Sequence, residues 1–304
     1  MEFRICVETR LDDRILSPGL ERQWHPWARV EAAAAAIPDA LPLHFIFHTG
    51  HVGSTLLSRL VDEAAPALGL REPLPLRTLA QMLDARAPAF DTRLAVFLKL
   101  WRRVFRPGQV AVVKATSSSG RAAPAVLRAS PASRAVYLNL RAEPYLATLL
   151  AGANAMVDLK GFEAERTARL RTMLSGADVR AASVGELAAL SWLAESLTRA
   201  RVLASFAGRV LPLDFDRLLA DLPATMESVL RHFELPFDPA FVSHIARSPV
   251  LTRYSKAPQQ YEYSPRFRAQ LLAQARAEHA GEIRRGLLWL ETIAKTNADV
   301  AAVL

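Results

Sequence analysis

The chain has 304 residues, of which 51% are hydrophobic and 22% charged, enough apolar material for one large α/β domain or a core domain with a helical extension. Its 38 lysines and arginines outnumber 30 aspartates and glutamates, and the net charge of +8 favours anionic ligands. The arginines are spread along the whole chain without a dense basic tract or zinc-finger spacing, so the composition does not favour nucleic acid as a partner.

The cysteine content and the N-terminal sequence bear on the compartment. Cys6 is the only cysteine, so the chain can form no internal disulfide and no cysteine-based metal cage, which suits a reducing cytoplasm. Residues 1–14 carry scattered charges, and no uncharged run approaches the length needed to span a bilayer. We therefore expect a cytoplasmic protein with no membrane span.

The segment LHFIFHTGHVGSTLLSR, residues 43–59, predicts a buried strand, a glycine loop and a helix that begins at Ser54. Backbone N–H groups and the helix dipole at such a start bind phosphate-like anions, and Gly50 and Gly53 allow close backbone approach. Aligning Gly53 with the second glycine of the ATP/GTP loop G-x-x-x-x-G-K-[ST] puts a serine where the lysine belongs, which disfavours a magnesium-nucleotide site. An ordinary strand-turn-helix would also produce this pattern.

Further apolar runs predict strands at 68–70, 110–115, 135–140 and 210–215, alternating with helices. Continuous hydrophobic runs are what a parallel sheet covered on both faces requires. We therefore predict an α/β fold with a parallel sheet of about five strands, helices on both faces, a P-loop-like first turn and a helical C-terminal region.

Two segments between the strands carry separate expectations. Residues 91–105 predict an amphipathic helix packed on the sheet, with an apolar stripe made by Leu94, Phe97, Leu98, Trp101 and Phe105. Residues 156–182 are charged and poorly periodic, which predicts a mobile or partly helical insertion of the kind that often acts as a lid. We expect a single domain over residues 1–304, with its core at about 41–250, a helical insertion or lid at 156–206 and C-terminal helices at 264–304.

Residues that directly follow the predicted strands are candidates for the site, because ligands collect beyond the carboxyl ends of an open parallel sheet. Arg71-Glu72-Pro73 follows the second strand, Lys114 with residues 116–119 the third, and Arg141 the fourth. Lys114 ends an apolar run, so its ammonium must emerge at the strand tip or be paired. A carboxylate, cations, hydroxyls and an anion loop at one edge suit transfer of an anionic group to a hydroxyl or amine.

These residues resemble the sulfotransferase family, which uses 3′-phosphoadenosine 5′-phosphosulfate as co-substrate. The family's loop for the donor's 5′-phosphosulfate reads [KR]-x-G-[ST]-T-x, and this chain has His51-Val52-Gly53-Ser54-Thr55-Leu56. Arg141-Ala142-Glu143-Pro144 is similar to the family's turn for the 3′-phosphate, and LPLDFDRLLADLPATMESVLRHFELPFD to its later strand and helix. The resemblance covers about residues 43–260. It implies that residues 50–56 bind the donor, that adenosine 3′,5′-bisphosphate is the product, and that no metal is needed.

The chain departs from the family pattern at positions that bind the donor. His51 stands where the family has lysine or arginine, so positive charge there depends on pH, since an unperturbed imidazole titrates at about 6.5. The hydroxyl expected after Arg141 is approximately supplied by Thr148, and the family's C-terminal R-K-G-x-x-G loop is absent. A basic, hydroxyl-bearing stretch at 252–256, with Arg253 and Lys256, would serve in its place.

Each candidate has a proposed role and a structural alternative. Glu72 is the candidate general base for the acceptor, or else a surface carboxylate in a proline turn. Lys114 and His51 would support the sulfuryl group and the departing oxygen, or else be a strand-end lysine and a turn-capping histidine. Arg141 would take the 3′-phosphate in two hydrogen bonds, or else pair with a carboxylate such as Glu143.

Two other groups receive structural interpretations. The hydroxyl cluster Thr116, Ser117, Ser118 and Ser119 favours an ordinary polar turn. His44 and His48 share a face of the first strand, but no third ligand stands at a recognisable metal spacing, so we expect no catalytic metal.

The sequence thus predicts a sulfotransferase-like enzyme that acts on a small-molecule acceptor. Two alternatives keep the fold. An ATP-dependent, kinase-like phosphotransferase would require magnesium-dependent ATP binding. A non-catalytic nucleotide-binding protein would be consistent with His51 and with the missing C-terminal glycine loop.

Overall fold

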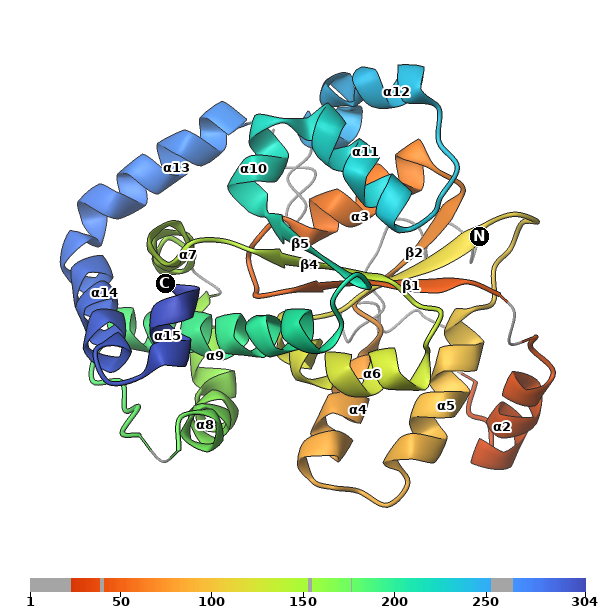
Figure 1. Ribbon diagram of the computed structural model, residues 1–304, viewed down its shortest axis with the longest axis horizontal. Coiled ribbons are helices and arrows are strands. Elements are labelled where there is room, and N and C mark those ends of the chain that lie inside the picture. Colours follow the sequence, from red (N-terminus) through yellow and green to blue (C-terminus); the bar gives the residue numbers. More distant parts are fainter. Residues whose placement is uncertain (1–22, 39–40, 153–154, 176, 253–264) are drawn as a thin grey trace.

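The computed structural model describes residues 23–38, 41–152, 155–175, 177–252 and 265–304. They contain a five-stranded parallel sheet ordered β2-β3-β1-β4-β5 (Figure 1). The α/β class and the parallel sheet expected from the sequence are confirmed. The strands are β1 (Leu43–His48), β2 (Ala67–Arg71), β3 (Val110–Lys114), β4 (Ala135–Asn139) and β5 (Val210–Asp214).

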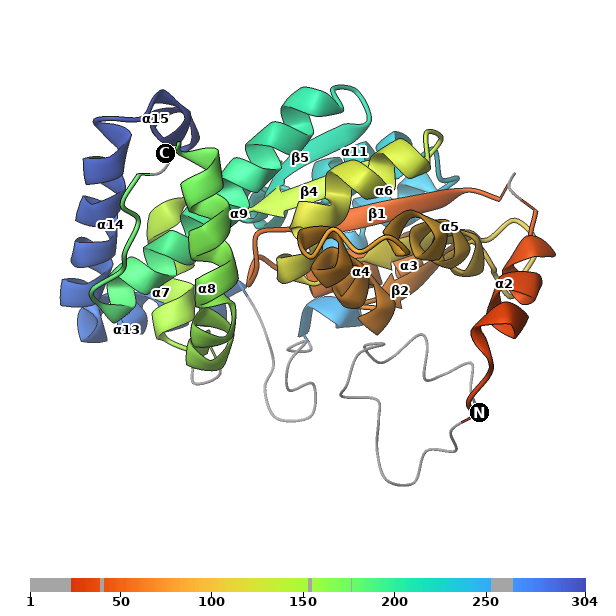
Figure 2. The ribbon, with the colours of Figure 1, turned by 90° about the horizontal axis from the view of Figure 1, so that it is seen from below.

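Helices cover both faces of this sheet and gather beyond the carboxyl ends of its strands. Helices α3, α10 and α11 lie on one face, and α4, α5, α6 and part of α9 on the other (Figure 1). Figure 2 shows α13, α14 and α15 at one end of the molecule and α2 at the opposite end. The helices are α2 (Trp27–Ala35), α3 (Ser54–Ala64), α4 (Leu74–Asp84), α5 (Phe90–Trp101), α6 (Ala123–Ala129), α7 (Ala142–Leu150), α8 (Ala155–Met173), α9 (Val184–Ser205), α10 (Phe215–Ala220), α11 (Leu222–His232), α12 (Pro239–Ser243), α13 (Pro265–Glu278), α14 (Ala280–Ala294) and α15 (Ala298–Val303), with 3-10 turns η2 (Ser117–Ala122), η3 (Ile245–Arg247) and η4 (Pro249–Thr252).

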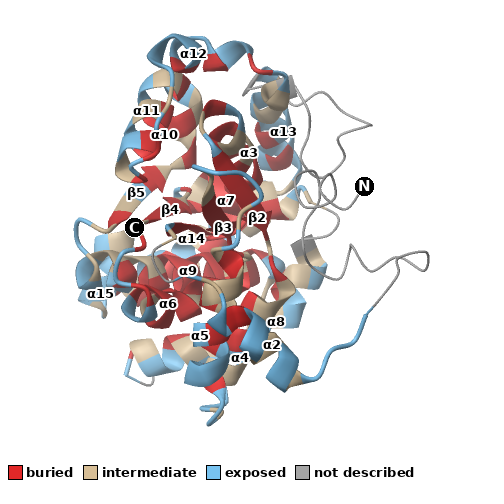
Figure 3. Cartoon of the chain, turned by 90° about the vertical axis from the view of Figure 1, so that its right-hand side faces the viewer, coloured by how far each residue is buried: buried red, intermediate tan, exposed pale blue. Residues whose placement is uncertain are grey.

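Two apolar clusters, one on each face, hold the sheet in place. On β1, Phe45 and Phe47 face the cluster shared with α4, α5 and α6, whereas Ile46 faces the cluster shared with α3, α9 and α11. This alternation is the period of two that a strand imposes on its side chains. All six residues of β1 are buried, and Figure 3 shows the sheet as the buried centre of the molecule. No helix among the described residues is long and apolar enough to cross a bilayer.

The predicted helix 91–105 is too long at its C-terminal end. Helix α5 ends at Trp101, and Phe105 is 54% exposed instead of packing on the sheet. The chain after the helix forms a turn before β3, in which Gln109 N–H donates to Arg106 O and Phe105 N–H to the Gln109 side chain. Pro107 and Gly108 occupy this turn. A proline-glycine pair cannot continue a helix, so α5 ends before the predicted apolar stripe reaches Phe105.

The charged insertion at 156–182 is partly helical, which is one of the two alternatives expected for it. Helix α8 runs from Ala155 to Met173 and packs on α9. Its Arg166 is 1% exposed and lies 3.4 Å from Glu195 of α9, which also pairs with Arg169 at 2.7 Å. Because charged side chains form much of the buried side of this helix, its hydrophobic pattern shows no helical period.

Candidate active site

The anion loop, residues 49–56, joins β1 to α3 through a series of left-handed residues. The φ angles of Gly50, His51 and Gly53 are 99°, 53° and 70°. The first backbone bond of α3 runs from Leu57 N–H to Gly53 O, so the N–H groups of Ser54 to Leu56 precede it and remain available at the helix start. An anion beyond this start would meet N–H donors and the positive end of the helix dipole.

Gly53 is fixed by sterics as well as by its φ angle. A Cβ atom on Gly53 would lie 2.0 Å from Cε2 of Phe215, the first residue of α10. No side chain fits in that space, and the left-handed backbone adds a cost for any L-residue that has one. The ring of Phe215 therefore packs directly beneath the anion loop.

His48 holds the start of the loop. Its Nδ1 accepts the Gly50 N–H at 3.1 Å, and its Nε2 donates to Ala115 O at 2.8 Å, which requires the neutral Nε2–H tautomer. Burial and the nearby Lys114 charge lower the pKa of His48 to about 3. This arrangement corrects one expectation, because the Gly50 N–H is already bonded and is not available to an anion.

Glu72 and Lys114 meet at the carboxyl ends of β2 and β3. The strand register places Arg71 opposite Lys114, and the Glu72 N–H donates to Lys114 O at 2.7 Å. The Lys114 ammonium forms an ion pair with the Glu72 carboxylate, and the two side chains are 2% and 12% exposed. Such pairing offsets part of the cost of removing each charge from water. The structure thus brings the two predicted residues together, and Glu72 adopts a left-handed φ of 55°.

Arg71 connects this strand end to the helix that follows the anion loop. Its guanidinium, in a side chain that is 2% exposed, pairs with Asp62 of α3. A Cβ on Gly69 would lie 2.6 Å from Asp62 Oδ2, so the glycine is needed for the helix to approach β2 this closely. Burial raises the pKa of Asp62 to about 6 despite the opposing effect of Arg71.

The hydroxyl cluster after β3 forms a turn. Thr116 caps η2, and its Oγ1 lies 2.8 Å from Ser119 Oγ and 3.4 Å from Ser118 Oγ. Ser118 and Ser119 are buried. These hydroxyls bond one another, as in the polar turn favoured by the sequence.

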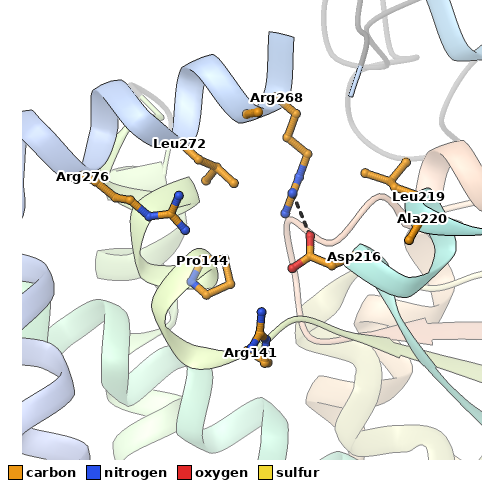
Figure 4. A pocket seen from close by; sticks show the side chains of 9 residues that line it. Arg141, Pro144, Asp216, Leu219, Ala220, Arg268, Leu272 and Arg276 are labelled. Carbon is orange, nitrogen blue, oxygen red and sulfur yellow. Dashed lines mark ion pairs between the residues drawn. The ribbon is translucent and has the colours of Figure 1, made fainter. Parts of the chain in front are cut away.

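A pocket of about 410 Å³ opens beyond β4 and β5, where Arg141 directly precedes α7. Figure 4 shows Arg276 extending from α13 toward Pro144 in the first turn of α7, Arg268 extending toward Asp216, and Arg141 beneath them. We call this the arginine pocket. Its lining residues are Arg141, Pro144, Asp216, Leu219, Ala220, Arg268, Ala269, Leu272 and Arg276.

Two of these arginines are held by carboxylates at the pocket wall. Arg268 lies 2.7 Å from Asp216, and Arg276 donates two hydrogen bonds to Glu143 at 2.6 and 2.8 Å. The bonds from Arg276 lower the pKa of Glu143. Glu143 thus pairs with Arg276, whereas the sequence had suggested Arg141 as its alternative partner.

The sequence prediction missed the two arginines of α13 that line the pocket. Arg268, Leu272 and Arg276 recur every four residues and so share a helix face. That spacing could have identified them as a group, but it could not show that α13 packs on α7. The other residues predicted to contact the 3′-phosphate do not line this pocket as described. The Thr148 hydroxyl donates to Pro144 O at 2.7 Å within α7, and Thr148 is not among the lining residues. Arg253 and Lys256 lie outside the described residues.

Phe215 links the anion loop to the arginine pocket. It packs under Gly53, and the guanidinium carbon of Arg268 lies 5.0 Å from the centre of its ring. The next residue, Asp216, lines the pocket. The two regions are therefore neighbours along one edge of the sheet, separated by a single aromatic side chain.

No group of three or more histidines, cysteines, aspartates or glutamates suited to a metal ion occurs within the described residues. His44 and His48 do share a face of β1, but each has a structural partner. His44 stacks on Phe233 with ring centroids 5.2 Å apart, and its Nδ1 accepts the Arg134 N–H. Burial lowers the pKa of His44 to about 4.

Comparison with known proteins gives structural neighbours only. No protein-family model and no curated protein matches the chain. Solved structures similar to it include a sulfotransferase domain from the curacin biosynthetic pathway (13% identity, TM-score 0.43, 82% of this chain and 97% of that one) and a sulfotransferase from Alicyclobacillus acidocaldarius (14%, 0.42, 81% and 96%). A sulfotransferase from Mycobacterium avium shares 13% identity, with a TM-score of 0.45 and coverage of 83% and 80%. Similarity of this degree assigns no activity, so function must be argued from the residues of the site.

Proposed function

We propose that this chain is a sulfotransferase that moves a sulfuryl group from 3′-phosphoadenosine 5′-phosphosulfate to a hydroxyl or amine of a small-molecule acceptor. The observation that carries the proposal is the adjacency of two anion-binding regions of different kinds. One is a helix start without the lysine of an ATP/GTP loop, and the other is a pocket with three arginines. A nucleotide with phosphate groups at both its 5′ and 3′ positions has anions to place in each.

The donor would bind with its 5′-phosphosulfate at the anion loop, where the N–H groups that precede the first bond of α3 are available. Its 3′-phosphate would enter the arginine pocket. Arg141 is exposed there, and its planar guanidinium suits a bidentate hydrogen-bonding pattern. Arg268 and Arg276 would add positive charge from α13, in the role that the sequence had given to residues 252–256.

The chemical step would take place near Glu72 and Lys114. The acceptor oxygen or nitrogen forms a bond to sulfur while the bond from sulfur to the 5′-phosphate oxygen breaks, and the acceptor's proton passes to the Glu72 carboxylate. The leaving phosphate oxygen gains negative charge, which the loop N–H groups, Lys114 and a protonated His51 would stabilise. Every role in this step is supplied by a side chain or a backbone group, without a metal ion.

Calorimetry with adenosine 3′,5′-bisphosphate, AMP and ATP tests this function. We expect adenosine 3′,5′-bisphosphate to bind in the presence of a chelator and at least about tenfold more tightly than AMP, because only the bisphosphate reaches Arg141. Arg141→Ala should remove most of this preference over AMP. Mass spectrometry of an acceptor panel incubated with the donor should then detect a sulfated product.

Other outcomes separate the alternatives. Tight binding of ATP that depends on magnesium, with no binding of the bisphosphate, would overturn the proposal in favour of a phosphotransferase. Binding of the bisphosphate without turnover over a broad panel of alcohols, phenols and amines would favour a non-catalytic nucleotide-binding protein.

A further inference from the structure

The anion loop rests on a buried tyrosine of α7. The Tyr145 hydroxyl donates to Thr49 O at 3.1 Å, at the first residue of the loop. A Cβ on Gly50 would lie 3.4 Å from that same hydroxyl, so the tyrosine oxygen lies directly against the bend. Tyr145 is 1% exposed, and burial raises its pKa, which keeps the phenol protonated and able to donate.

Ser191 of α9 completes this contact. Its Oγ lies 3.1 Å from the Tyr145 hydroxyl. A phenol has one hydrogen, and that of Tyr145 is directed to Thr49 O, so the Ser191 hydroxyl must be the donor in the second bond. The result is a chain of two hydrogen bonds from α9 through α7 to the anion loop.

The neighbouring residue on α9 supports the other phosphate region. Trp192, 2% exposed, donates its Nε1–H to Leu140 O at 2.8 Å. Leu140 directly precedes Arg141, so this bond fixes the backbone from which the Arg141 side chain extends. Two consecutive residues of α9 thus connect to the two regions: Trp192 bonds directly to the backbone before Arg141, and Ser191 is linked to the anion loop through Tyr145.

We propose that Ser191 and Trp192, with Tyr145 as intermediary, are positioning residues that make α9 the common support of the two phosphate sites. This inference rests on the proposed function for its ligand, but the part that concerns the anion loop can be tested without one. Helix α9 suits the role because it is long and mostly buried. It is also fixed to α14, where the Gly185 N–H donates to a Glu282 carboxylate oxygen at 2.8 Å.

The chain contains matched controls for each of these residues. Tyr137 is a second fully buried tyrosine, whose hydroxyl has no hydrogen-bond partner among the described residues. Ser196 is a second buried serine of α9 whose Oγ likewise has none in the described part of the chain. Trp289 of α14 also donates its indole N–H to a carbonyl, that of Arg180, away from the site.

Hydrogen exchange of the wild-type protein and two pairs of variants tests the support of the loop without any ligand. Tyr145→Phe should accelerate exchange at the Thr49 and Gly50 amides by about five- to tenfold, the effect of losing one buried hydrogen bond. Ser191→Ala should have a smaller effect at the same amides. Tyr137→Phe and Ser196→Ala should leave these amides unchanged. Acceleration spread equally over β4 and α9, or none at the loop, would overturn the proposal.

Nucleotide affinity gives a second readout that a general loss of stability would not produce. Tyr145→Phe should weaken adenosine 3′,5′-bisphosphate and AMP by the same factor, about five- to tenfold, because both ligands use the anion loop. Trp192→Phe should instead weaken the bisphosphate more than AMP, whereas Trp289→Phe should change neither. Equal losses for both ligands in Trp192→Phe would contradict its role. If the wild type binds neither nucleotide, the proposed function fails, and the exchange data still decide whether α9 supports the loop.

Discussion

The anion loop and the arginine pocket lie at the same edge of the sheet, but they are built from different groups. The loop offers backbone N–H groups, held in place by buried contacts from His48, Phe215 and Tyr145. The pocket offers long side chains, that of Arg141 just before α7 and those of Arg268 and Arg276 on α13, the latter two paired with carboxylates. We therefore expect the loop to be sensitive to shape and insensitive to salt, and the pocket to be sensitive to charge and tolerant of changes in shape.

The largest expected effect is on turnover and comes from a residue outside both regions. It tests whether the anion loop and the arginine pocket bind the nucleotide without carrying out the chemical step. Glu72→Gln should lower turnover by about 10²- to 10⁴-fold, because it removes the proton acceptor. The affinity for adenosine 3′,5′-bisphosphate should stay within about twofold, since Glu72 belongs to neither region. Glu227→Gln, on the exposed side of α11, is the control, and retained turnover in Glu72→Gln would exclude Glu72 as the base.

The shape dependence of the loop is tested by Gly53→Ala. The new Cβ would overlap Phe215 at 2.0 Å in a left-handed backbone, so we expect a loss of about 2–5 kcal/mol in unfolding free energy from overpacking and strain together, and no measurable nucleotide binding. The control is Gly161→Ala in α8, where a Cβ meets nothing within 4 Å and should be neutral or stabilising. Normal nucleotide binding by the Gly53→Ala variant would contradict the account of the loop.

The buried imidazole of His48 makes the loop end of the molecule sensitive to acid. Its pKa is lowered to about 3 in the folded state, so between that value and about 6.5 the unfolded chain binds a proton that the folded chain does not. Stability therefore falls as the pH falls through this window. From pH 7 to pH 5 the advantage of the wild type over His48→Gln should shrink by about 2 kcal/mol.

Two other groups titrate near this range. Both are present in the wild type and in His48→Gln, so their contributions to stability cancel in the comparison. His44 changes stability in the same direction as His48. Asp62 has a raised folded pKa, so its contribution is lost as the pH rises toward about 6. Denaturant unfolding of wild type and variant across the range measures the difference in stability, and a difference that does not change with pH would show that folding does not lower the pKa of His48.

The smallest effect concerns the charge dependence of the pocket. Arg276→Ala should weaken adenosine 3′,5′-bisphosphate by about three- to tenfold and leave AMP unchanged, because its half-exposed guanidinium acts mainly through a screened charge. Added salt should reduce this difference. Arg285→Ala, which removes an exposed arginine of α14, is the control, and equal weakening of AMP would show that Arg276 does not act on the 3′-phosphate.

The same contrast explains which parts of the site could be predicted from sequence. The glycine loop after β1 and the meeting of Glu72 with Lys114 could be predicted, because Glu72 follows one strand and Lys114 ends another, each identified by its own apolar run, and the strand register brings the two together. The roles of the candidate residues stay predictions. Arg268 and Arg276 were missed, because they act through the packing of α13 on α7, where the paired residues Glu143 and Arg276 are 133 positions apart.

The wrong end of the helix predicted at 91–105 and the lack of a helical period in residues 156–182 have comparably local causes. Helix α5 stopped before Phe105 because a turn with proline and glycine must follow it. Helix α8 could not be recognised by apolar periodicity because its buried residues include Arg166, matched by Glu195 of another helix. The contact of α9 with the anion loop could not be predicted from sequence either, because nothing in the sequence indicates that Ser191 packs beside Tyr145.

The most direct test of the central claim is a crystal structure with adenosine 3′,5′-bisphosphate bound in the presence of a chelator. The account predicts the 5′-phosphate at the backbone N–H groups of the anion loop, from Ser54 to Leu56, and the 3′-phosphate beside Arg141, with Arg268 or Arg276 turned toward it. A nucleotide bound elsewhere, or bound with its phosphates exchanged between the two regions, would contradict the account.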